Sequence, residues 1–135
     1  MKSAFMVYYT FEGNTGYAAE LIQSALFQED PALHEMSTDI SAYDNIIIAF
    51  PIWAGTYPPA IGSFIKRCPI KGKNIFLIAC SGSGRSEKAF DNIKKKLSGN
   101  TFCGELSLVE PLKYREKSQR QIDEFVKKIE SAMAD

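Results

Sequence analysis

Two short stretches of uninterrupted apolar residues constrain the fold of this chain more than any other feature. Residues 46–50 read Ile-Ile-Ile-Ala-Phe, and residues 75–80 read Ile-Phe-Leu-Ile-Ala-Cys. Strands this continuously apolar are buried on both faces, which is typical of a parallel sheet with helices on each side. The two strands, which are predicted to begin at Asn45 and Asn74 just before these stretches, therefore indicate an α/β fold.

Helical and strand-like patterns alternate along the whole chain. Apolar residues recur at helical spacing over 18–26, 61–68, 89–97 and 122–133. Further strands are predicted at 4–9, 33–36 and 102–109, and the last is expected to be an outer strand because its pattern is weaker. This alternation requires right-handed crossovers and a parallel sheet between two helical layers. An open doubly wound sheet of five strands is favoured over a barrel, which needs about 250 residues.

Composition predicts a single domain spanning residues 1–135. Sixteen basic residues balance sixteen acidic ones, so no charge excess favours nucleic acid or an anionic membrane as a partner. Cys68, Cys80 and Cys103 form no CxxC pair, which argues against a metal site and a disulfide framework. The sequence shows neither a signal-peptide pattern nor the apolar run of about 18–20 residues that crosses a bilayer. We therefore expect a soluble, cytoplasmic protein with reduced thiols.

The loop from Thr10 to Thr15 carries the clearest functional signal. It offers hydroxyl and amide donors, and Gly13 permits close approach of the backbone to a ligand. A loop between a strand and a helix directs free N–H groups and the positive end of the helix toward one spot, which favours a phosphate. The loop is neither a Walker A motif nor GxGxxG. The alternative is an ordinary turn in which Asn14 or Thr15 caps the helix.

Two further loops follow strands and should meet the first loop at the same edge of the sheet. Residues 51–59 contain Trp53, the only tryptophan, together with Gly55 and Tyr57, and aromatic rings suit stacking on a flat ligand. Residues 81–85 have little side-chain bulk, so a planar ligand could lie against their amides. A phosphate joined to a flat aromatic ring would satisfy all three loops, which makes FMN the leading candidate.

Together these loops resemble those of the flavodoxin family. Residues 10–15 resemble its phosphate loop, and residues 50–56 resemble the loop with its inner flavin-stacking aromatic. Residues 80–84 lie where its second flavin loop begins. The resemblance covers nearly the whole chain and implies a five-stranded sheet in the order 2-1-3-4-5. It also implies that FMN binds at the switch between the first and third strands.

A role for each loop is implied by the same resemblance. Thr10 and residues 13–15 would hold the phosphate, Trp53 would pack on the isoalloxazine ring, and residues 81–84 would offer amides to its pyrimidine end. The peptide near Gly55 would turn a carbonyl toward flavin N5. The candidate cofactor-binding residues are Thr10, Phe11, Glu12, Gly13, Asn14, Thr15, Pro51, Trp53, Ala54, Gly55, Thr56, Tyr57, Ser81, Gly82, Ser83 and Gly84.

This chain departs from the family pattern at three points. Glu12 replaces the usual threonine, so its carboxylate either points away from the phosphate or weakens binding. The third loop has no aromatic residue, which leaves the outer ring face to Tyr57, a partner or solvent. The balanced charge differs from the acidic surfaces that steer flavodoxins to basic partners.

An electron carrier is the first functional hypothesis. A non-covalent FMN protein that serves a reductase or an acceptor enzyme needs no acid or base, and the sequence offers no convincing pair, since His34 stands alone. The alternative is an FMN-dependent NAD(P)H oxidoreductase that reduces a quinone or a small acceptor. A receiver-like signalling domain ranks far below, because Thr10 and Phe50 occupy positions where receivers need acids. We expect a monomer or a weak dimer.

Overall fold

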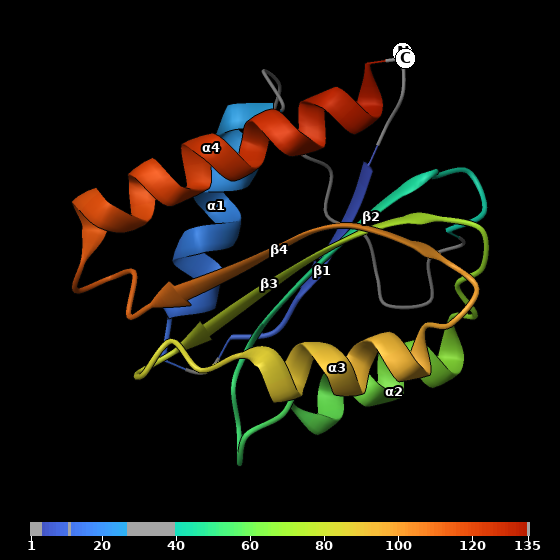
Figure 1. Cartoon of the computed structure of the whole chain (residues 1–135), viewed down its shortest axis with the longest axis horizontal. Coiled ribbons are helices and arrows are strands. Elements are labelled where there is room, and N and C mark those ends of the chain that lie inside the picture. The colour runs from blue at the N-terminus through green and yellow to red at the C-terminus, as the bar shows by residue number, and fades with distance from the viewer. Residues whose placement is uncertain (1–3, 11, 27–39, 135) are drawn as a thin grey trace.

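The computed structural model describes residues 4–10, 12–26 and 40–134. Within this part of the chain, four parallel strands form one sheet in the order β1-β2-β3-β4 (Figure 1). The strands are β1 (Ala4–Tyr8), β2 (Asn45–Pro51), β3 (Asn74–Ser81) and β4 (Thr101–Val109). The two apolar stretches form the central strands β2 and β3, as predicted, and β4 lies at an edge.

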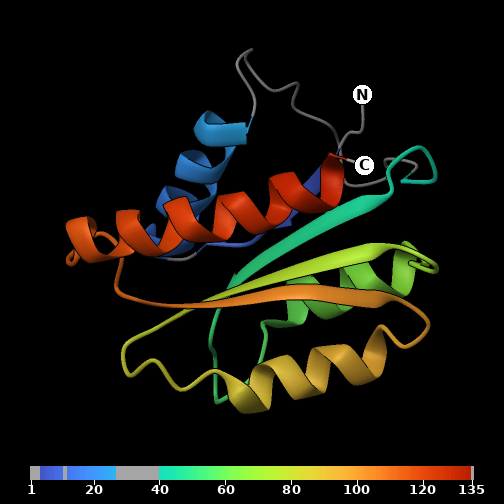
Figure 2. The same ribbon diagram turned by 45° about the horizontal axis from the view of Figure 1, so that its top comes forward.

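Helices cover both faces of the sheet, which confirms the predicted α/β architecture (Figures 1 and 2). The helices are α1 (Asn14–Leu26), α2 (Pro59–Arg67), α3 (Glu87–Lys96) and α4 (Arg115–Met133). Helices α1 and α4 lie on one face, and α2 and α3 lie on the other. None of the helices in the described ranges is long and apolar enough to span a membrane.

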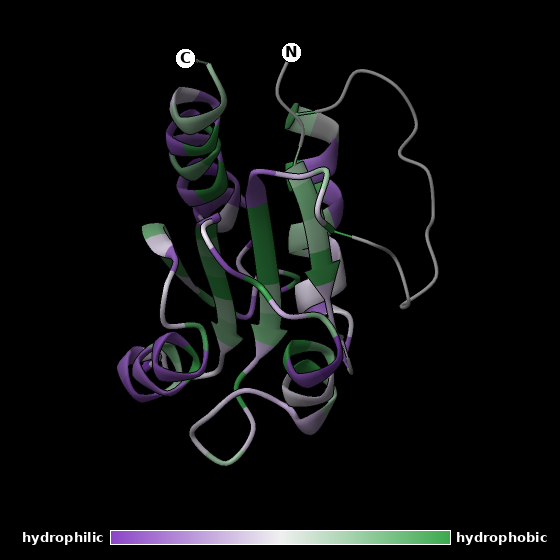
Figure 3. Ribbon diagram, turned by 90° about the vertical axis from the view of Figure 1, so that its right-hand side faces the viewer, coloured by the Kyte–Doolittle hydropathy of each residue, from purple (hydrophilic) through white to green (hydrophobic). Residues whose placement is uncertain are grey.

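The core has two halves because successive residues of a strand point to opposite faces of the sheet. Ile46, Ile48 and Phe50 of β2 pack toward α2 and α3, whereas Ile47 and Ala49 pack toward α1 and α4. All five are fully buried. Figure 3 shows the strands as a hydrophobic centre with hydrophilic residues on the helices around it. This two-sided burial explains why the sequence of β2 shows no alternation.

The predicted strand order 2-1-3-4-5 requires correction. The sheet has four strands in the described part of the chain, and they follow one another in space in chain order. The strand predicted at 33–36 lies outside the described residues. That prediction depended on four residues, and so short a stretch has too few repeats to specify a strand by periodicity.

A glycine in β4 lets two aromatic rings cover the sheet. The pairing of β3 with β4 shifts register between Ile75 and Phe76. At Gly104, opposite Phe76, a Cβ atom would lie 3.0 Å from the Phe125 ring and 3.4 Å from the Phe76 ring. These two rings meet edge to face with their centroids 6.1 Å apart. The rings therefore fill the space that a side chain at Gly104 would need.

Candidate functional site

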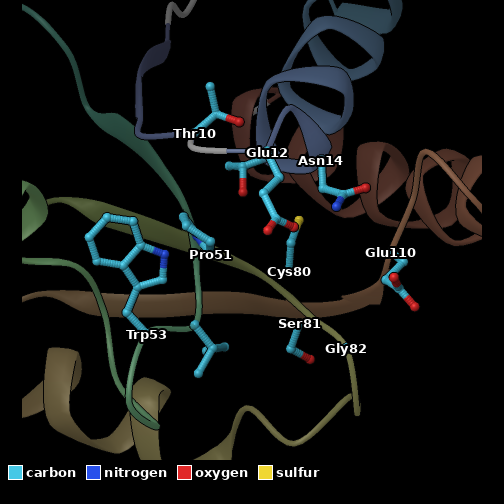
Figure 4. Close-up of a pocket in the computed structure, with 11 residues that line it drawn as sticks. Thr10, Glu12, Asn14, Pro51, Trp53, Cys80, Ser81, Gly82 and Glu110 are labelled. Atoms are coloured by element: carbon cyan, nitrogen blue, oxygen red, sulfur yellow. The ribbon is translucent and has the colours of Figure 1, made fainter.

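A pocket of about 220 Å³ opens at the carboxyl ends of the strands (Figure 4). After β1 the chain turns to α1 on one face, whereas after β2 it turns to α2 on the other. Loops that diverge to opposite faces leave a crevice between them, and ligands of open α/β sheets bind in such crevices. The lining residues are Thr10, Glu12, Asn14, Thr15, Pro51, Ile52, Trp53, Cys80, Ser81, Gly82 and Glu110.

The first wall of the pocket is the loop that leads from β1 into α1. The Thr10 hydroxyl accepts a hydrogen bond of 3.1 Å from the Gly13 N–H, and the Gly13 carbonyl accepts one of 2.9 Å from Tyr17. Gly13 has a φ of +93°, and a Cβ atom there would lie 3.3 Å from the Leu112 side chain. The loop is therefore tight, and it brings the N-terminus of α1 to the pocket.

Asn14 connects this loop to the segment that follows β4. Its side-chain oxygen accepts a hydrogen bond of 2.9 Å from the backbone N–H of Leu112, which is 98 residues away in the sequence. The NH₂ group of the same side chain is a hydrogen-bond donor at the pocket wall. Asn14 therefore holds two distant parts of the site in register.

Thr15 is the residue whose environment points most directly to a ligand. Its side chain is 1% exposed, and its hydroxyl has no hydrogen-bond partner among the described residues. The hydroxyl lies near the thiol of Cys80, which is too weak a partner to replace the hydrogen bonds to water that burial removes. A buried polar group left in this state at the wall of a pocket is suited to bind a ligand.

Cys80 occupies the carboxyl end of β3 beneath this loop. Burial raises the pKa of the Cys80 thiol to about 11, and the neighbouring Thr15 hydroxyl offsets only part of that effect. The thiol is therefore neutral at physiological pH. Within the described residues none of the three cysteines forms a disulfide bond, and no cluster of histidine, cysteine and acidic residues could hold a metal ion.

We expect Cys80 to react with iodoacetamide about 100-fold more slowly than a thiol with the ordinary pKa of 9.0, because only the thiolate attacks. Peptide mass spectrometry after timed alkylation at pH 8 measures the rate. Cys103, which is half-buried and outside the pocket, serves as the internal reference. Equal rates at Cys80 and Cys103 would show that the base of the pocket opens to solvent.

The second wall is a two-residue turn that presents Trp53. The backbone N–H groups of Trp53 and Thr56 donate to each other's carbonyls at 2.8 and 3.0 Å. The central residues Ala54 and Gly55 have φ values of 51° and 81°, which is the pattern of a type I′ turn. The side-chain amide of Asn92 in α3 donates to the Thr56 hydroxyl at 3.0 Å. The turn is thus closed by its own hydrogen bonds and is anchored to α3 at Thr56, which fixes the position of Trp53 at its start.

Trp53 provides the aromatic wall of the pocket. Its ring meets that of Tyr9 edge to face, with the centroids 5.3 Å apart. Figure 4 shows the indole beside Pro51, across the pocket from Asn14 and Glu110. An indole held in this way offers a flat surface to a planar ligand.

The third wall is the turn after β3. The Ser81 hydroxyl accepts a hydrogen bond of 2.8 Å from the Gly84 N–H, and the Ser107 hydroxyl donates to the Gly84 carbonyl at 3.1 Å. Ser81 and Gly82 line the pocket. Gly84, with a φ of +78°, packs against Val109 on the other side. Only the first half of this loop therefore contributes to the site.

The structure brings part of the predicted set together. Eight of the predicted residues line the pocket: Thr10, Glu12, Asn14, Thr15, Pro51, Trp53, Ser81 and Gly82. Seven others do not: Gly13, Ala54, Gly55, Thr56, Tyr57, Ser83 and Gly84. Phe11 lies outside the described residues. Tyr57 packs instead against the core beneath α2, where a Cβ atom at Gly62 would be 3.4 Å from its ring.

Sequence reasoning missed three lining residues. Ile52 and Cys80 are apolar residues at the ends of buried strands, so their sequence pattern indicates only core. Glu110 follows β4 directly, has a φ of 36° and donates its backbone N–H to the Ser81 carbonyl at 3.1 Å. The rule that ligands bind beyond the carboxyl ends of strands could have identified Glu110, had it been applied to the outer strand as well.

The donors of the pocket fit a phosphate better than any metal ion. Hydroxyl groups of Thr10 and Thr15, the amide of Asn14 and the N-terminus of α1 converge on one wall. The buried hydroxyl of Thr15 has no hydrogen-bond partner among the described residues, and a phosphate oxygen would provide one. The indole of Trp53 stands on another wall, so a phosphorylated ligand with a flat ring suits the whole pocket.

Comparison with solved structures supports the same architecture. Flavodoxin 2 of Bacillus cereus is 21% identical with a TM-score of 0.77, and the match covers 96% of this chain and 99% of that one. The Megasphaera elsdenii flavodoxin is 20% identical with a TM-score of 0.73, covering 93% and 99%. A flavoprotein of Lactobacillus acidophilus, solved in complex with FMN, is 16% identical with a TM-score of 0.67, covering 86% and 98%. These likenesses establish the fold.

Family assignment depends on a separate comparison. No curated protein matches the chain. A family model described as Flavodoxin matches residues 6–128, a range that includes all three loops of the pocket. The chain therefore belongs to the flavodoxin family.

Proposed function

We propose that this chain binds FMN in the pocket and carries electrons between proteins. The observation that carries the proposal is the buried, unpartnered hydroxyl of Thr15 beside the N-terminus of α1, opposite the aromatic wall of Trp53. The FMN complex of the Lactobacillus acidophilus flavoprotein, which has the same fold, supports it. A reductase or an acceptor enzyme in the cytoplasm would be the partner, and the chain would act as a monomer or weak dimer.

Each wall of the pocket has a role in this proposal. Thr10, Asn14 and Thr15 donate hydrogen bonds to the phosphate, and the part of the chain that the structure describes places no lysine or arginine at the pocket wall to assist them. Trp53 packs against the ring and excludes water from one face of it. The backbone amides of Ser81 and Gly82 are available to the polar edge of the ring. FMN supplies the redox chemistry when bound, and the chain positions the ring and sets the charges around it.

The turn at Ala54 and Gly55 is the backbone segment that is proposed to change orientation beside the flavin ring. Its backbone lies in the left-handed region, which costs energy at Ala54 because only glycine adopts it without strain. Hydrogen bonds at Trp53 and Thr56 hold both ends of the turn while the central peptide remains exposed. A peptide held in this way can change orientation without moving its neighbours.

Titration of the purified protein with FMN tests the proposal. Trp53 is the only tryptophan, so its fluorescence reports ring stacking without interference from other indoles. We expect FMN to quench this fluorescence at a ratio of one FMN per chain, and the bound flavin to survive gel filtration. A folded protein that shows no quenching and retains no flavin would contradict the proposal.

The same preparation separates a carrier from an enzyme. If the chain is a carrier, NAD(P)H alone does not bleach the bound flavin, whereas a separate flavodoxin reductase with NADPH does. Rapid bleaching by NAD(P)H without added reductase would favour an oxidoreductase instead.

A further inference from the structure

The charge of the pocket conflicts with the ligand it is shaped to hold. Among the described residues, those that line the pocket include two carboxylates, Glu12 and Glu110, and no lysine or arginine. A phosphate monoester has a second pKa of about 6, so it adds nearly two negative charges at neutral pH. The hydroxyl and amide donors are neutral, so only the partial positive charge at the N-terminus of α1 opposes the repulsion between a carboxylate and a phosphate dianion.

Glu12 is the carboxylate that lies where a bound phosphate would repel it. It lies in the same loop as Thr10 and Asn14, within three residues of the buried Thr15 hydroxyl. Figure 4 shows its side chain extending into the pocket toward Cys80, whereas Glu110 lies at the far side next to the loop after β4. In the structure Glu12, an exposed residue, is therefore turned toward the pocket and not away from it.

We propose that Glu12 couples FMN binding to the uptake of one proton, which the bound phosphate shares with the Glu12 carboxyl group. This inference rests on the proposed function, since it concerns the same pocket and the same ligand. A shared proton converts the repulsion between two anions into a hydrogen bond between a carboxylic acid and a phosphate oxygen. Riboflavin, which lacks the phosphate, takes up no proton on binding.

Among the described residues that line the pocket, Glu110 is the one other carboxylate that could take the place of Glu12. Pro51, Ile52 and Trp53 of the second wall carry no charge. The Cys80 thiol keeps its own proton across the physiological range, because burial raises its pKa to about 11. In the segment after β4, the cations of Lys113 and Arg115 lie over the rings of Tyr114 and Tyr17, at 5.4 and 5.2 Å from the ring centroids. Glu110 remains as the competing acid, and it requires its own variant.

The dissociation constant of FMN measured from pH 6 to pH 8.5 tests the proposal. Below about pH 6 the free phosphate already carries the proton, so the dissociation constant should be flat. Above that pH the proton must be taken from water, and we expect the dissociation constant to rise about tenfold per pH unit. Calorimetry at pH 8 in buffers of different ionisation enthalpy should count close to one proton taken up per FMN.

Matched variants assign the proton to Glu12. Glu12→Gln and Glu12→Thr should abolish the rise in the dissociation constant above pH 6.5, and both should bind FMN more tightly than the wild type at pH 8. Glu20→Gln, which removes the same charge from an exposed position of α1 outside the pocket, should keep the wild-type slope. Glu110→Gln should also keep it. Riboflavin should bind every variant without pH dependence.

Two results would overturn the inference while leaving FMN binding intact. One is a wild-type dissociation constant for FMN that stays constant from pH 6 to pH 8.5. The other is an unchanged slope in Glu12→Gln, and loss of the slope in Glu110→Gln would assign the proton to the other carboxylate. Absence of flavin binding at every pH would instead refute the proposed function itself.

Discussion

Replacing Phe76 with alanine is expected to lower the free energy of unfolding by about 3–5 kcal/mol. Phe76 is fully buried in the centre of the sheet and meets the Phe125 ring edge to face. Gly104, which lies opposite Phe76 on β4, has no side chain that could move into the space that the ring would leave. Urea denaturation followed by circular dichroism at 25 °C measures the loss, which is large against the total stability of about 5–15 kcal/mol of most domains.

Two further variants show whether the cavity causes this loss. Phe76→Leu keeps most of the volume and should cost less than half as much. Phe102→Ala removes the same ring from β4 at a partly buried position, where Lys94 covers it, and should also cost less. A loss below about 1 kcal/mol in Phe76→Ala would mean that Phe125 and α4 move to close the space.

The fold was predictable wherever burial leaves a pattern in the sequence. The strands β2 and β3 are fully buried, and their uninterrupted apolar runs identified them. The helices α3 and α4 each bury one apolar face, which produces a repeat of 3.6 residues. The segment 33–36 offered only four residues of weak pattern, and the strand order built on it could not be derived by periodicity.

The sequence indicated which loops lie at the same edge of the sheet, but it could not indicate the direction of each side chain. The rule for open sheets placed residues 10–15, 51–59 and 81–85 at one edge, where the pocket indeed lies. That rule does not say which way each side chain points. Tyr57 is partly buried and packs against the core, and Ser83 and Gly84 do not reach the pocket. Such details depend on contacts with Gly62 and Val109, which are distant in sequence and leave no local signal.

The Thr15 hydroxyl indicates a binding site because it is buried in a way that destabilises the free protein. A folded chain normally pairs its buried hydroxyl groups, yet the Thr15 hydroxyl has no partner among the described residues. An unpaired buried group costs about 1–3 kcal/mol, and a ligand that pairs with it recovers that energy. The cost in the free protein and the gain on binding therefore have the same physical origin. This link predicts opposite effects of one substitution on stability and on affinity.

Thr15→Val should raise the dissociation constant of FMN about 10- to 100-fold, because it removes a hydrogen bond to a charged phosphate worth about 1.5–3 kcal/mol. The same substitution should leave the stability of the FMN-free protein unchanged or raise it by about 1 kcal/mol, since valine has the shape of threonine without the unpaired hydroxyl. Quenching of Trp53 fluorescence gives the affinity, and urea denaturation without FMN gives the stability.

The variant Thr15→Ser and the ligand riboflavin are the controls for these opposite effects on affinity and stability. Serine retains the hydroxyl, so its affinity for FMN should stay within a few-fold of the wild type, although the lost methyl group lowers stability by about 1 kcal/mol. Riboflavin should bind Thr15→Val as well as it binds the wild type, because the hydroxyl acts on the phosphate. A Thr15→Val protein that is less stable but binds FMN normally would show that this hydroxyl serves the fold and that the phosphate is held elsewhere.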